Sequence, residues 1–596
     1  AGLAYTPLFE IDGAEVVQEG DRLHQVVADP FVGEDEGTGV VHLAPYGEDD
    51  FRIARREGIR VAMAVGDQGR FTCPAGPVEE GTFFKEANLP LCRDLESRGR
   101  MIRRVSTLHS YPHCWRCDTP LLYKPSPAWF LRTTDYAEVM VEENAKIEWA
   151  PPELGSARFG EWLEGNVDWA LSRDRYWGTP IPVWECGADS DHWDCLGSFA
   201  ELAERVGGLP EDFDPHRPGI DAHVFPCSRE GCQGAMTRVP QVVDCWFDSG
   251  AMPFAQYHWP FENRATVAEQ FPADFICEGL DQTRGWFYTL HAIAVFLTRV
   301  DEGLWESGEL EGEPLPRLEP GGAYRSVLVN GLLLDDQGCK MSKRLGNLVD
   351  PWAACADHGV DAVRWALLGG GSTHLSRRWS DDGIREIRRR ILGTLTSSYD
   401  FLSLYASTES WIPPKVSPPL GERPAMDRWI LSRTAAAAEE ARVAWEALDP
   451  PNALRALEKL VVEELSNWYI RRSRRRFWSG GDDAECAFST LHGVLGMVAR
   501  MAAPATPFLA ESLWGRLGES GSVHLAPFPD PSLPETGFQA DSRDLALEAA
   551  MDGIVRAATL GRAVRERARI RVRQPLPKVL VHVAGGGLGG DEGEDP

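Results

Sequence analysis

The chain has 596 residues and a formal net charge of −29, with 43% hydrophobic and 25% charged residues. This length predicts roughly three to five domains, and the composition is typical of a globular protein. No run of about 18 apolar residues occurs, which argues against a membrane span. The acidic charge argues against sequence-blind nucleic-acid binding but leaves open an RNA partner held by local basic patches.

The start of the chain and its cysteines add two expectations. There is no signal peptide, and the chain starts at Ala1 rather than Met, which predicts a fragment or a processed form. The 13 cysteines, several of them in close pairs, indicate reduced thiols in a cytoplasmic protein and make metal sites a candidate.

The first hundred residues alternate short apolar runs with Gly and Pro, a pattern typical of β-rich structure. Within them, a strand-like run ends in His42, and a turn leads to an acidic run that ends at Asp50. An imidazole and a carboxylate facing one pocket could bind an α-amino group and position a hydrolytic water. Alternatively, His42 makes a structural hydrogen bond and the acidic run starts a helix.

Two groups of cysteines have spacings that raise the question of zinc. Cys114 and Cys117 form a Cys-x-x-Cys pair, but zinc needs four ligands and no second pair lies nearby. Further on, two loose pairs about forty residues apart are consistent with a zinc ribbon. Their spacings are wider than usual, so free buried thiols are the alternative. The candidate ligands are Cys186, Cys195, Cys227 and Cys232, with His192 as a substitute for Cys195.

Two strand–loop units follow, over 239–250 and 271–297, and the second opens a helix that continues to about Leu297. In α/β sheets, ligands bind at the carboxyl ends of strands. Polar side chains in these loops can accept hydrogen bonds from ribose hydroxyls and an ammonium group, a glycine allows close backbone approach, and two tryptophans offer flat walls for a branched aliphatic side chain. Each tryptophan alone is more readily explained as core than as part of a pocket. The candidate binding residues are Trp246, Glu278, Gly279, Asp281, Gln282 and Trp286.

An apolar, strand-like run over 326–334 leads into the decapeptide GCKMSKRLGN, residues 338–347. Lys340 and Lys343 are separated by Met341 and Ser342. Together they make a small, mobile, positively charged site that suits the anionic triphosphate. Fixed positive charge aimed at the charge that develops on pyrophosphate lowers a barrier by roughly 3–4 kcal/mol per well-placed donor. A solvated basic turn is the alternative. Lys340, Ser342 and Lys343 are therefore the catalytic candidates, with Lys343 as the main one. We call residues 338–347 the lysine loop.

From about residue 386 to 520 the apolar residues recur at helical spacing, which predicts an all-α region. A helix within it ends in a run where arginines and aromatic residues alternate. Such a run can bind RNA, with arginine on phosphate and aromatic rings on bases, or it can compensate the helix dipole. The RNA-binding candidates are Arg471, Arg472 and Arg475. The end, 585–596, is rich in Gly and acidic residues and is predicted to be disordered.

Together these motifs resemble the isoleucyl-tRNA synthetases, a family of class I aminoacyl-tRNA synthetases, from about residue 9 to 576. The decapeptide is similar to the KMSKS signature, and the two strand–loop units are similar to the isoleucyl-adenylate site. The segment around His42 resembles the editing domain, where the matching His shapes the side-chain pocket and Asp50 matches the Asp that holds the amino group of misattached valine. His42 points to isoleucine rather than valine or leucine. The helical region resembles the anticodon-binding domain.

The resemblance implies a multidomain α/β enzyme that ligates L-isoleucine to its tRNA through an adenylate and hydrolyses mischarged valyl-tRNA. The fold would be the second half of a class I Rossmann-like catalytic core, a β-rich editing insertion and an all-α anticodon-binding bundle. ATP with Mg²⁺ is the implied co-substrate, zinc is a candidate, and a cytoplasmic monomer is expected. The expected boundaries are 1–120 for editing, 121–180 for the return to the core, 181–238 for the cysteine insertion, 239–385 for the core, 386–535 for the bundle and 536–596 for the junction and tail.

The sequence departs from the family in three ways. It contains no His-x-Gly-His motif, so the chain alone is expected not to activate isoleucine. The Thr-rich strand that would face Asp50 is absent, and a small residue usually found between Pro45 and Tyr46 is missing. A non-catalytic tRNA-binding fragment or pseudoenzyme, a valine-specific relative and a zinc-stabilised nucleic-acid-binding protein are the alternatives.

Overall fold

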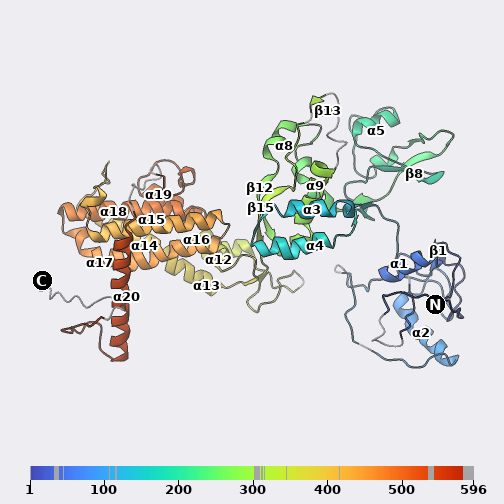
Figure 1. The fold of residues 1–596 in the computed structure, drawn as a ribbon, viewed down its shortest axis with the longest axis horizontal. Helices are drawn as coiled ribbons and strands as arrows, with labels where there is room; N and C mark the ends of the chain where they lie inside the picture. The colour runs from blue at the N-terminus through green and yellow to red at the C-terminus, as the bar shows by residue number, and fades with distance from the viewer. Residues whose placement is uncertain are drawn as a thin grey trace. The chain divides into compact units, whose positions relative to one another are not determined.

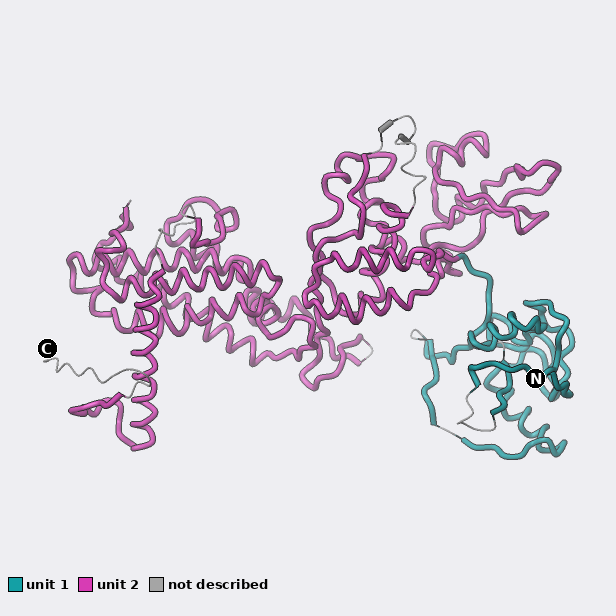
Figure 2. The backbone as a smooth tube through the Cα atoms, viewed as in Figure 1, with its two compact units in different colours: residues 1–129 teal, residues 130–596 magenta. Residues whose placement is uncertain are grey.

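The computed structural model describes residues 2–32, 39–44, 46–106, 108–114, 117–300, 309–310, 313–314, 316–343, 345–414, 416–533 and 543–581. The chain forms two compact units, residues 1–129 and 130–596, coloured separately in Figure 2. The disorder predicted for 585–596 concerns residues outside the described ones. No helix among the described residues is long and apolar enough to cross a membrane.

The first unit combines two short strands with two helices. Strand β1 (Glu15–Gln18) pairs antiparallel with β2 (Val61–Met63), and the helices are α1 (Glu48–Glu57) and α2 (Phe84–Ser97). The other backbone pairings described here are isolated bridges. The described residues of this unit therefore form fewer regular strands than the alternating pattern predicts, because Gly and Pro break the apolar runs before a ladder can extend.

The second unit begins with a three-stranded parallel sheet, which supports the predicted α/β class. Its order is β12 (Ala273–Gly279), β15 (Tyr324–Asn330) and β4 (Glu148–Ala150). Gly279 lies opposite Asn330, so both longer strands end at the same edge. Helix α9 (Trp286–Val295) packs in the buried core beside them, and its His291 donates from Nε2 to the Met140 carbonyl of α3 (Ala137–Asn144) at 2.8 Å.

Short strands surround this sheet and build a small ribbon beside it. The ribbon sheet is antiparallel in the order β8, β7, β10, β9 and has its own core around Trp184 and Met236. The remaining elements of the core and ribbon are β3 (Phe130–Leu131), α4 (Glu161–Glu164), β5 (Trp169–Ala170), β6 (Ser172–Arg173), β7 (Val183–Cys186), β8 (Asp189–Cys195), α5 (Phe199–Val206), β9 (Phe225–Pro226), β10 (Ala235–Arg238), β11 (Val242–Val243), α6 (Cys245–Gly250), α7 (Met252–Ala255), α8 (Arg264–Gln270), β13 (Glu309–Leu310), β14 (Glu313–Pro314), β16 (Leu333–Leu334) and β17 (Arg377–Arg378).

From residue 381 to 567 the described elements are helical, and long helices such as α15 (Ala425–Glu446) and α18 (Gly481–Ala502) pack against one another (Figure 1). The periodicity predicts helices only from about residue 386 to 520, so α20 (Leu545–Arg567) lies in the stretch predicted to be a junction and tail. Among the apolar residues that recur at helical spacing in the sequence, Leu457, Leu460 and Leu465 are buried, as expected for one face of a helix. The helices after the lysine loop are α11 (Pro351–His358), α12 (Val360–Gly369), α13 (Asp381–Ile387), α14 (Gly393–Glu409), α15 (Ala425–Glu446), α16 (Pro450–Glu458), a π-helical continuation over Lys459–Ile470, α17 (Arg471–Ser473), α18 (Gly481–Ala502), α19 (Pro507–Arg516) and α20 (Leu545–Arg567).

Helix α12 joins the lysine-loop side of the unit to the helical bundle. Asp361 accepts hydrogen bonds from the backbone N–H groups of Phe508 and Leu509 at the start of α19, at 3.4 and 2.7 Å. Three residues later, Arg364 donates to the carbonyls of Pro504 and Ala505 at 2.9 and 3.1 Å. One face of α12 therefore satisfies both the unpaired N–H groups of one helix start and the carbonyls of the preceding turn.

Candidate functional site

The carboxyl end of β12 carries several of the predicted binding residues into helix α9. The strand ends at Gly279, and a 3₁₀ turn over Leu280–Arg284 presents Asp281 and Gln282. Glu278 and Asp281 are exposed to solvent. A Cβ atom at Gly279 would lie 2.7 Å from Asp281 Oδ1, so glycine lets this carboxylate lie close to the strand end. Two carboxylates are thus available to a ligand at the sheet edge.

The two predicted tryptophans lie on neighbouring helices. The backbone N–H of Trp286 donates to Gln282 Oε1 at 3.1 Å, and its indole Nε1 donates to the Ser249 carbonyl of α6 at 3.1 Å. Trp246, on the same helix α6, has ring atoms 3.3 Å from where a Cβ of Gly285 would lie, and it is 38% exposed. The structure therefore gathers Trp246, Gln282 and Trp286 around Gly285, with one indole partly open to solvent.

Asp244 fixes this arrangement, and sequence reasoning did not single it out. It is 4% exposed and caps α6 by accepting from the Trp246 backbone N–H. Its other oxygen accepts from Trp169 Nε1 at 3.2 Å and Arg173 Nη2 at 2.8 Å. A buried carboxylate with this many donors holds α6 in one orientation. Its signal in the sequence was only its position between a strand and a tryptophan.

The lysine loop leaves the sheet at Asn330 and is closed by a set of side-chain to backbone hydrogen bonds. Asp335 Oδ1 accepts from the backbone N–H groups of Gln337 and Cys339, at 3.0 and 2.7 Å, and Oδ2 accepts from Asn347 Nδ2 at 2.8 Å. Asn347 Oδ1 in turn accepts from the Ser342 backbone N–H at 2.8 Å. The hydrogen bond from Asn347, followed by that from the Cys339 N–H, lowers the pKa of Asp335, so this carboxylate stays charged. We call Asp335 and Asn347 the loop clasp.

The clasp leaves both lysines turned to solvent. Lys340 and Lys343 are exposed, and among the described residues neither ammonium has an ion-pair partner within 4 Å. Ser342 is occupied: its backbone donates to Asn347, and its Oγ accepts from the Leu345 N–H at 3.2 Å. In the described part of the loop, Lys340 and Lys343 are therefore unpaired cations three residues apart, and Ser342 shapes the turn.

Three thiols and an imidazole come together in the ribbon. Cys186 Sγ lies 3.5 Å from Cys232 Sγ, and Cys227 Sγ lies 3.2 Å from His192 Nδ1. All four atoms lie within 4.8 Å of one another. Ligands of a tetrahedral zinc at about 2.3 Å (S) and 2.0 Å (N) are roughly 3.5–3.8 Å apart, so the group fits zinc. The Ala188 backbone N–H lowers the pKa of the Cys186 thiol, which favours the thiolate that a metal requires.

Cys195, the ligand first expected from the sequence, lies outside this group. It pairs with Val183 at one end of the β7–β8 hairpin, whereas Cys186 stands at the other end, opposite Asp189. Three residues of strand separate these ends by roughly 10 Å. The register shifts between Glu185 and Cys186, and the bulge carries His192 instead. Among the described residues, Cys114 and Cys117 join no such group.

The predicted editing residues lie in the first unit around helix α1. Asp50 Oδ2 accepts from the Ala44 backbone N–H at 3.0 Å, so the carboxylate folds back over the turn that follows His42. His42 is exposed, and no contact between it and Asp50 is present. Asp50 lies in the first turn of α1, where acidic side chains complement the helix dipole. Pro45, beside the shortened segment, is outside the described residues.

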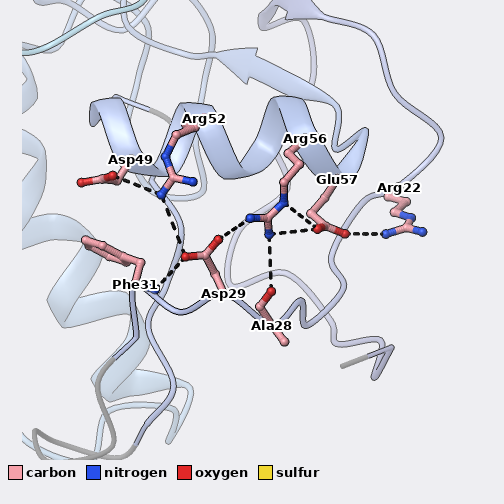
Figure 3. A network of polar contacts seen from close by, with 8 residues as sticks. All are labelled: Arg22, Ala28, Asp29, Phe31, Asp49, Arg52, Arg56 and Glu57. Carbon is pink, nitrogen blue, oxygen red and sulfur yellow. Dashed lines mark hydrogen bonds and ion pairs between the residues drawn. The ribbon is translucent and has the colours of Figure 1, made fainter. Parts of the chain in front are cut away.

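A network centred on Asp29 fastens the preceding loop to the same helix (Figure 3). Asp29 accepts from the Phe31 backbone N–H at 2.7 Å and from Arg56 Nη1 at 2.7 Å, and it lies 3.9 Å from Arg52. The Phe31 N–H, followed by the Arg56 guanidinium, lowers the pKa of Asp29. Glu57 then links Arg56 to Arg22 at 3.0 Å on each side. One face of α1 therefore holds the loop while Asp50 stands at its start.

The arginine run at the end of the π-helical segment divides into exposed and buried members. Arg471, Arg472 and Arg475 are exposed, and Arg472 lies 4.4 Å above the Trp468 ring. Arg476 behaves differently: it donates through Nη1 and Nη2 to the buried Asp427, at 2.7 Å each. The three residues predicted to bind RNA therefore remain available at the surface, while Arg476 is part of the core.

Comparison with known proteins gives these motifs a family. Residues 10–379 match the family model of class I tRNA synthetases (I, L, M and V), and residues 427–580 match the anticodon-binding domain of tRNA ligase. The chain is 42% identical to the isoleucine–tRNA ligase of Thermus thermophilus over 97% of its own length and 52% of the relative's. It is 41% identical to the isoleucine–tRNA ligase of Streptomyces avermitilis over 96% of the chain and 52% of the relative. The chain thus spans about half the length of these relatives.

A solved Mycobacterium tuberculosis methionyl-tRNA synthetase in complex with methionyl-adenylate aligns with 69% of the chain and 66% of its own, at 19% identity and a TM-score of 0.48. The family assignment rests on the sequence models, which cover the sheet with its lysine loop and the helical bundle separately and in this order. Since the first of them alone covers more than half of the chain, the chain belongs to the class I tRNA synthetases for isoleucine, leucine, methionine and valine.

Proposed function

We propose that this chain provides the lysine loop, the amino-acid pocket and the anticodon-binding region of an isoleucine–tRNA ligase that uses ATP. The identity of 42% to such a ligase over 97% of the chain carries the proposal. The geometry supports the proposal, because strands β12 and β15 end at the same sheet edge. Glu278 and Asp281 lie at the end of β12, and the loop with the unpaired Lys340 and Lys343 follows β15. Isoleucine, its tRNA, ATP brought as its magnesium complex, and a cytoplasmic location belong to the same proposal.

In this proposal the residues divide the work of forming an adenylate. A carboxylate oxygen of isoleucine attacks the α-phosphorus of ATP. The bond between this oxygen and the phosphorus forms, and the bond between the phosphorus and pyrophosphate breaks. Lys343, with Lys340, stabilises the charge that moves onto pyrophosphate. Glu278 and Asp281 accept from the amino group and the ribose hydroxyls, and Trp246 and Trp286 wall the aliphatic side chain. A hydroxyl of the tRNA terminus then displaces AMP.

The test joins the chain to the segment that carries the family's His-x-Gly-His motif, taken from the Thermus thermophilus relative. The fusion should catalyse isoleucine-dependent ATP–pyrophosphate exchange, and Lys343→Ala should reduce it by about 100-fold or more, the usual cost of one such donor. The chain alone should show no exchange above its Lys343→Ala variant. A fusion that folds and binds tRNA but exchanges no faster than Lys343→Ala would favour a tRNA-binding protein without chemistry. A preference for valine would favour the valine relatives.

Hydrolytic editing belongs to the same proposal. Isoleucine and valine differ by one methylene, worth only about 1–3 kcal/mol in a pocket, a limit for which isoleucyl-tRNA synthetase is itself the standard example. A second site must therefore grip the amino group and exclude the larger side chain. Asp50 provides the counter-charge for the ammonium and His42 borders the side chain. In the fusion, Asp50→Ala should abolish deacylation of valyl-tRNA and leave exchange nearly intact, and Lys343→Ala should do the reverse. Deacylation at the parent rate by Asp50→Ala would reject this role.

Zinc completes the proposal as a structural ion of the ribbon. Cys186, His192, Cys227 and Cys232 would hold it, and it would fix the ribbon strands without taking part in the reaction. A Cβ at Gly234 would lie 2.4 Å from Cys186 Sγ, so the turn after Cys232 leaves space for a thiolate at this position. This close approach is expected of a turn shaped around a metal.

A further inference from the structure

Two exposed aromatic rings at the boundary between the sheet and the ribbon remain without a role. Trp177 is 68% exposed and Tyr176 61% exposed, in the loop that follows β6. The Trp177 ring is stacked on the His216 ring with centroids 4.7 Å apart and planes inclined by 8°. The Arg217 guanidinium lies 5.0 Å from the centroid of Tyr176. Each ring is thus supported by a neighbour on one side and is largely open to solvent.

The supports are themselves held in place. Arg217 donates to the Pro240 carbonyl at 2.8 Å and to Asp221 at 2.9 Å. His216 Nδ1 lies 2.8 Å from Asp214 Oδ1. The loop is fixed from the other side, because a Cβ at Gly178 would lie 3.0 Å from Val242. The two rings therefore stand on a rigid base, and their open faces lose little conformational freedom on binding a flat ligand.

An unpaired cation lies beside the rings. Arg175 is exposed, and its guanidinium has no hydrogen-bond or ion-pair partner among the residues that the structure describes. It precedes Trp177 by two residues, which is roughly 7 Å of extended chain. That distance is of the order of the spacing between a nucleobase and the neighbouring phosphate. Stacking rings with an adjacent arginine are the usual combination for binding unpaired nucleotides.

The position of the rings relative to the candidate adenylate site narrows the ligand. The loop contacts Val242 of β11, and β11 runs directly into the Asp244 cap of α6, which carries Trp246. A nucleic acid on the rings therefore lies within a few residues of the amino-acid pocket. Unpaired nucleotides offer open base faces, whereas bases inside a duplex are stacked on each other, and an unpaired end is the part that must reach the amino-acid pocket.

We infer that Tyr176 and Trp177, with Arg175, form a stacking ledge for the single-stranded 3′ end of tRNA as it enters the aminoacylation site. This inference rests on the proposed function, since it names how the tRNA substrate reaches that site. A base stacks on the open face of Trp177, Tyr176 extends the ledge, and Arg175 meets a phosphate. Arg175, Tyr176 and Trp177 are binding residues here and take no part in bond making.

The test measures binding of two RNA hairpins to the 596-residue chain at fixed salt, one with a four-nucleotide 3′ overhang and one blunt. 2-Aminopurine in the overhang reports stacking by fluorescence quenching, and a fluorescein at the other end reports affinity by anisotropy. The overhang RNA should bind more tightly. Trp177→Ala should weaken it by about tenfold, remove the quenching and leave the blunt RNA unchanged. Trp177→Phe should keep most of the effect, and Arg175→Ala should weaken binding and flatten its salt dependence.

Trp193→Ala is the matched control, because Trp193 is an exposed tryptophan (51%) on strand β8 of the ribbon. It should bind both RNAs like the parent. The inference is overturned if the parent binds the two RNAs equally. It is also overturned if Trp177→Ala lowers the melting temperature without changing the affinity for the overhang RNA, because the ring would then only stabilise the packing between ribbon and sheet. The fusion's exchange assay separates this failure from failure of the proposed function, since exchange needs no tRNA.

Discussion

The parallel-sheet region and the helical bundle treat their charged residues in opposite ways. At the sheet edge, Lys340, Lys343 and Glu278 are exposed and have no ion-pair partner in the described chain. In the bundle, Arg433 lies between the carboxylates of Glu464 and Glu548, at 3.0 Å from each, with side chains only 8–10% exposed. Arg476, which is partly buried, pairs with the fully buried Asp427. Charges without partners mark the candidate chemistry, and charges with buried partners hold helices together.

This difference explains why sequence motifs of similar composition have different roles. The lysine loop and the arginine run are both short basic stretches. The described lysines of the loop, Lys340 and Lys343, are unpaired, whereas the arginine run combines exposed arginines with Arg476, which pairs with Asp427. In the arginine run, one of several neighbouring arginines reaches a buried carboxylate 49 residues away in sequence. Which arginine does so depends on helix phase, and local composition carries no sign of it.

The largest expected effect tests the bundle side of the comparison. Arg476→Ala leaves Asp427, whose side chain is fully buried, without its cation. Removing one partner of a buried pair usually costs about 3–5 kcal/mol, so the bundle should melt at much lower temperature, as measured by calorimetry. Arg475→Ala, its exposed neighbour, should change stability by less than about 0.5 kcal/mol. Equal melting of both variants would show that Arg476 is no more structural than its neighbours.

A second prediction tests the buried interior of the sheet region by pH. Burial lowers the pKa of His291 to about 4, below its ordinary value of 6.5. Between pH 6.5 and 4 the His291 side chain is therefore protonated in the unfolded chain but neutral in the folded chain. The free energy of unfolding should fall by roughly 3 kcal/mol in total as the pH drops from 6.5 toward 4. His291→Gln, which can still donate to the Met140 carbonyl, should flatten this dependence. The same slope in parent and variant, followed by denaturant unfolding, would contradict the buried neutral state.

The ribbon offers a third case, because the partner proposed for its thiols and imidazole is a zinc ion from outside the chain. The purified protein should carry about one tightly held zinc, and the double variant Cys227→Ala, Cys232→Ala should carry none. At a free zinc concentration of 100 Kd, the parent should gain about 2.7 kcal/mol of stability that the variant lacks. Cys195→Ala is the matched control, since it lies outside the group, and should keep the metal. Unchanged stoichiometry in the double variant would reject the assignment.

The smallest effect concerns the exposed arginines of the bundle. Arg471→Ala and Arg475→Ala should each weaken tRNA binding by a few-fold and reduce its salt dependence by about one phosphate contact, while the melting temperature stays unchanged. Arg389→Ala is a suitable control, because that exposed arginine is already paired with Glu386 at 2.7 Å. If Arg389→Ala weakens binding as much as Arg471→Ala, unpaired charge does not distinguish functional from structural arginines here.

Local sequence patterns predict much of the fold and of the candidate site, and the remaining features depend on contacts between residues far apart in the sequence. The strand before the lysine loop, the two strand–loop units and the helical stripe follow from periodicity and turn residues alone. The sequence named both Cys195 and His192 as ligands, and the choice of His192 depends on a bulge in β8, which residue spacing does not reveal. The Asp29 network joins residues 27 positions apart, and Asp244 reaches Arg173 across 71. Such polar contacts depend on tertiary packing, so a single sequence could not indicate them.

The loop clasp described above has a consequence for how this segment can vary. Asp335 and Asn347 hold the loop mainly through the backbone N–H groups of Gln337, Cys339 and Ser342. Backbone groups are supplied by almost any residue, so the side chains at 337 and 339 are free to drift without changing where the lysines stand. Asp335 and Asn347 themselves have no such freedom, since a longer or shorter side chain would miss its partners. Natural homologues should therefore vary more at positions 337 and 339 than at the clasp residues Asp335 and Asn347.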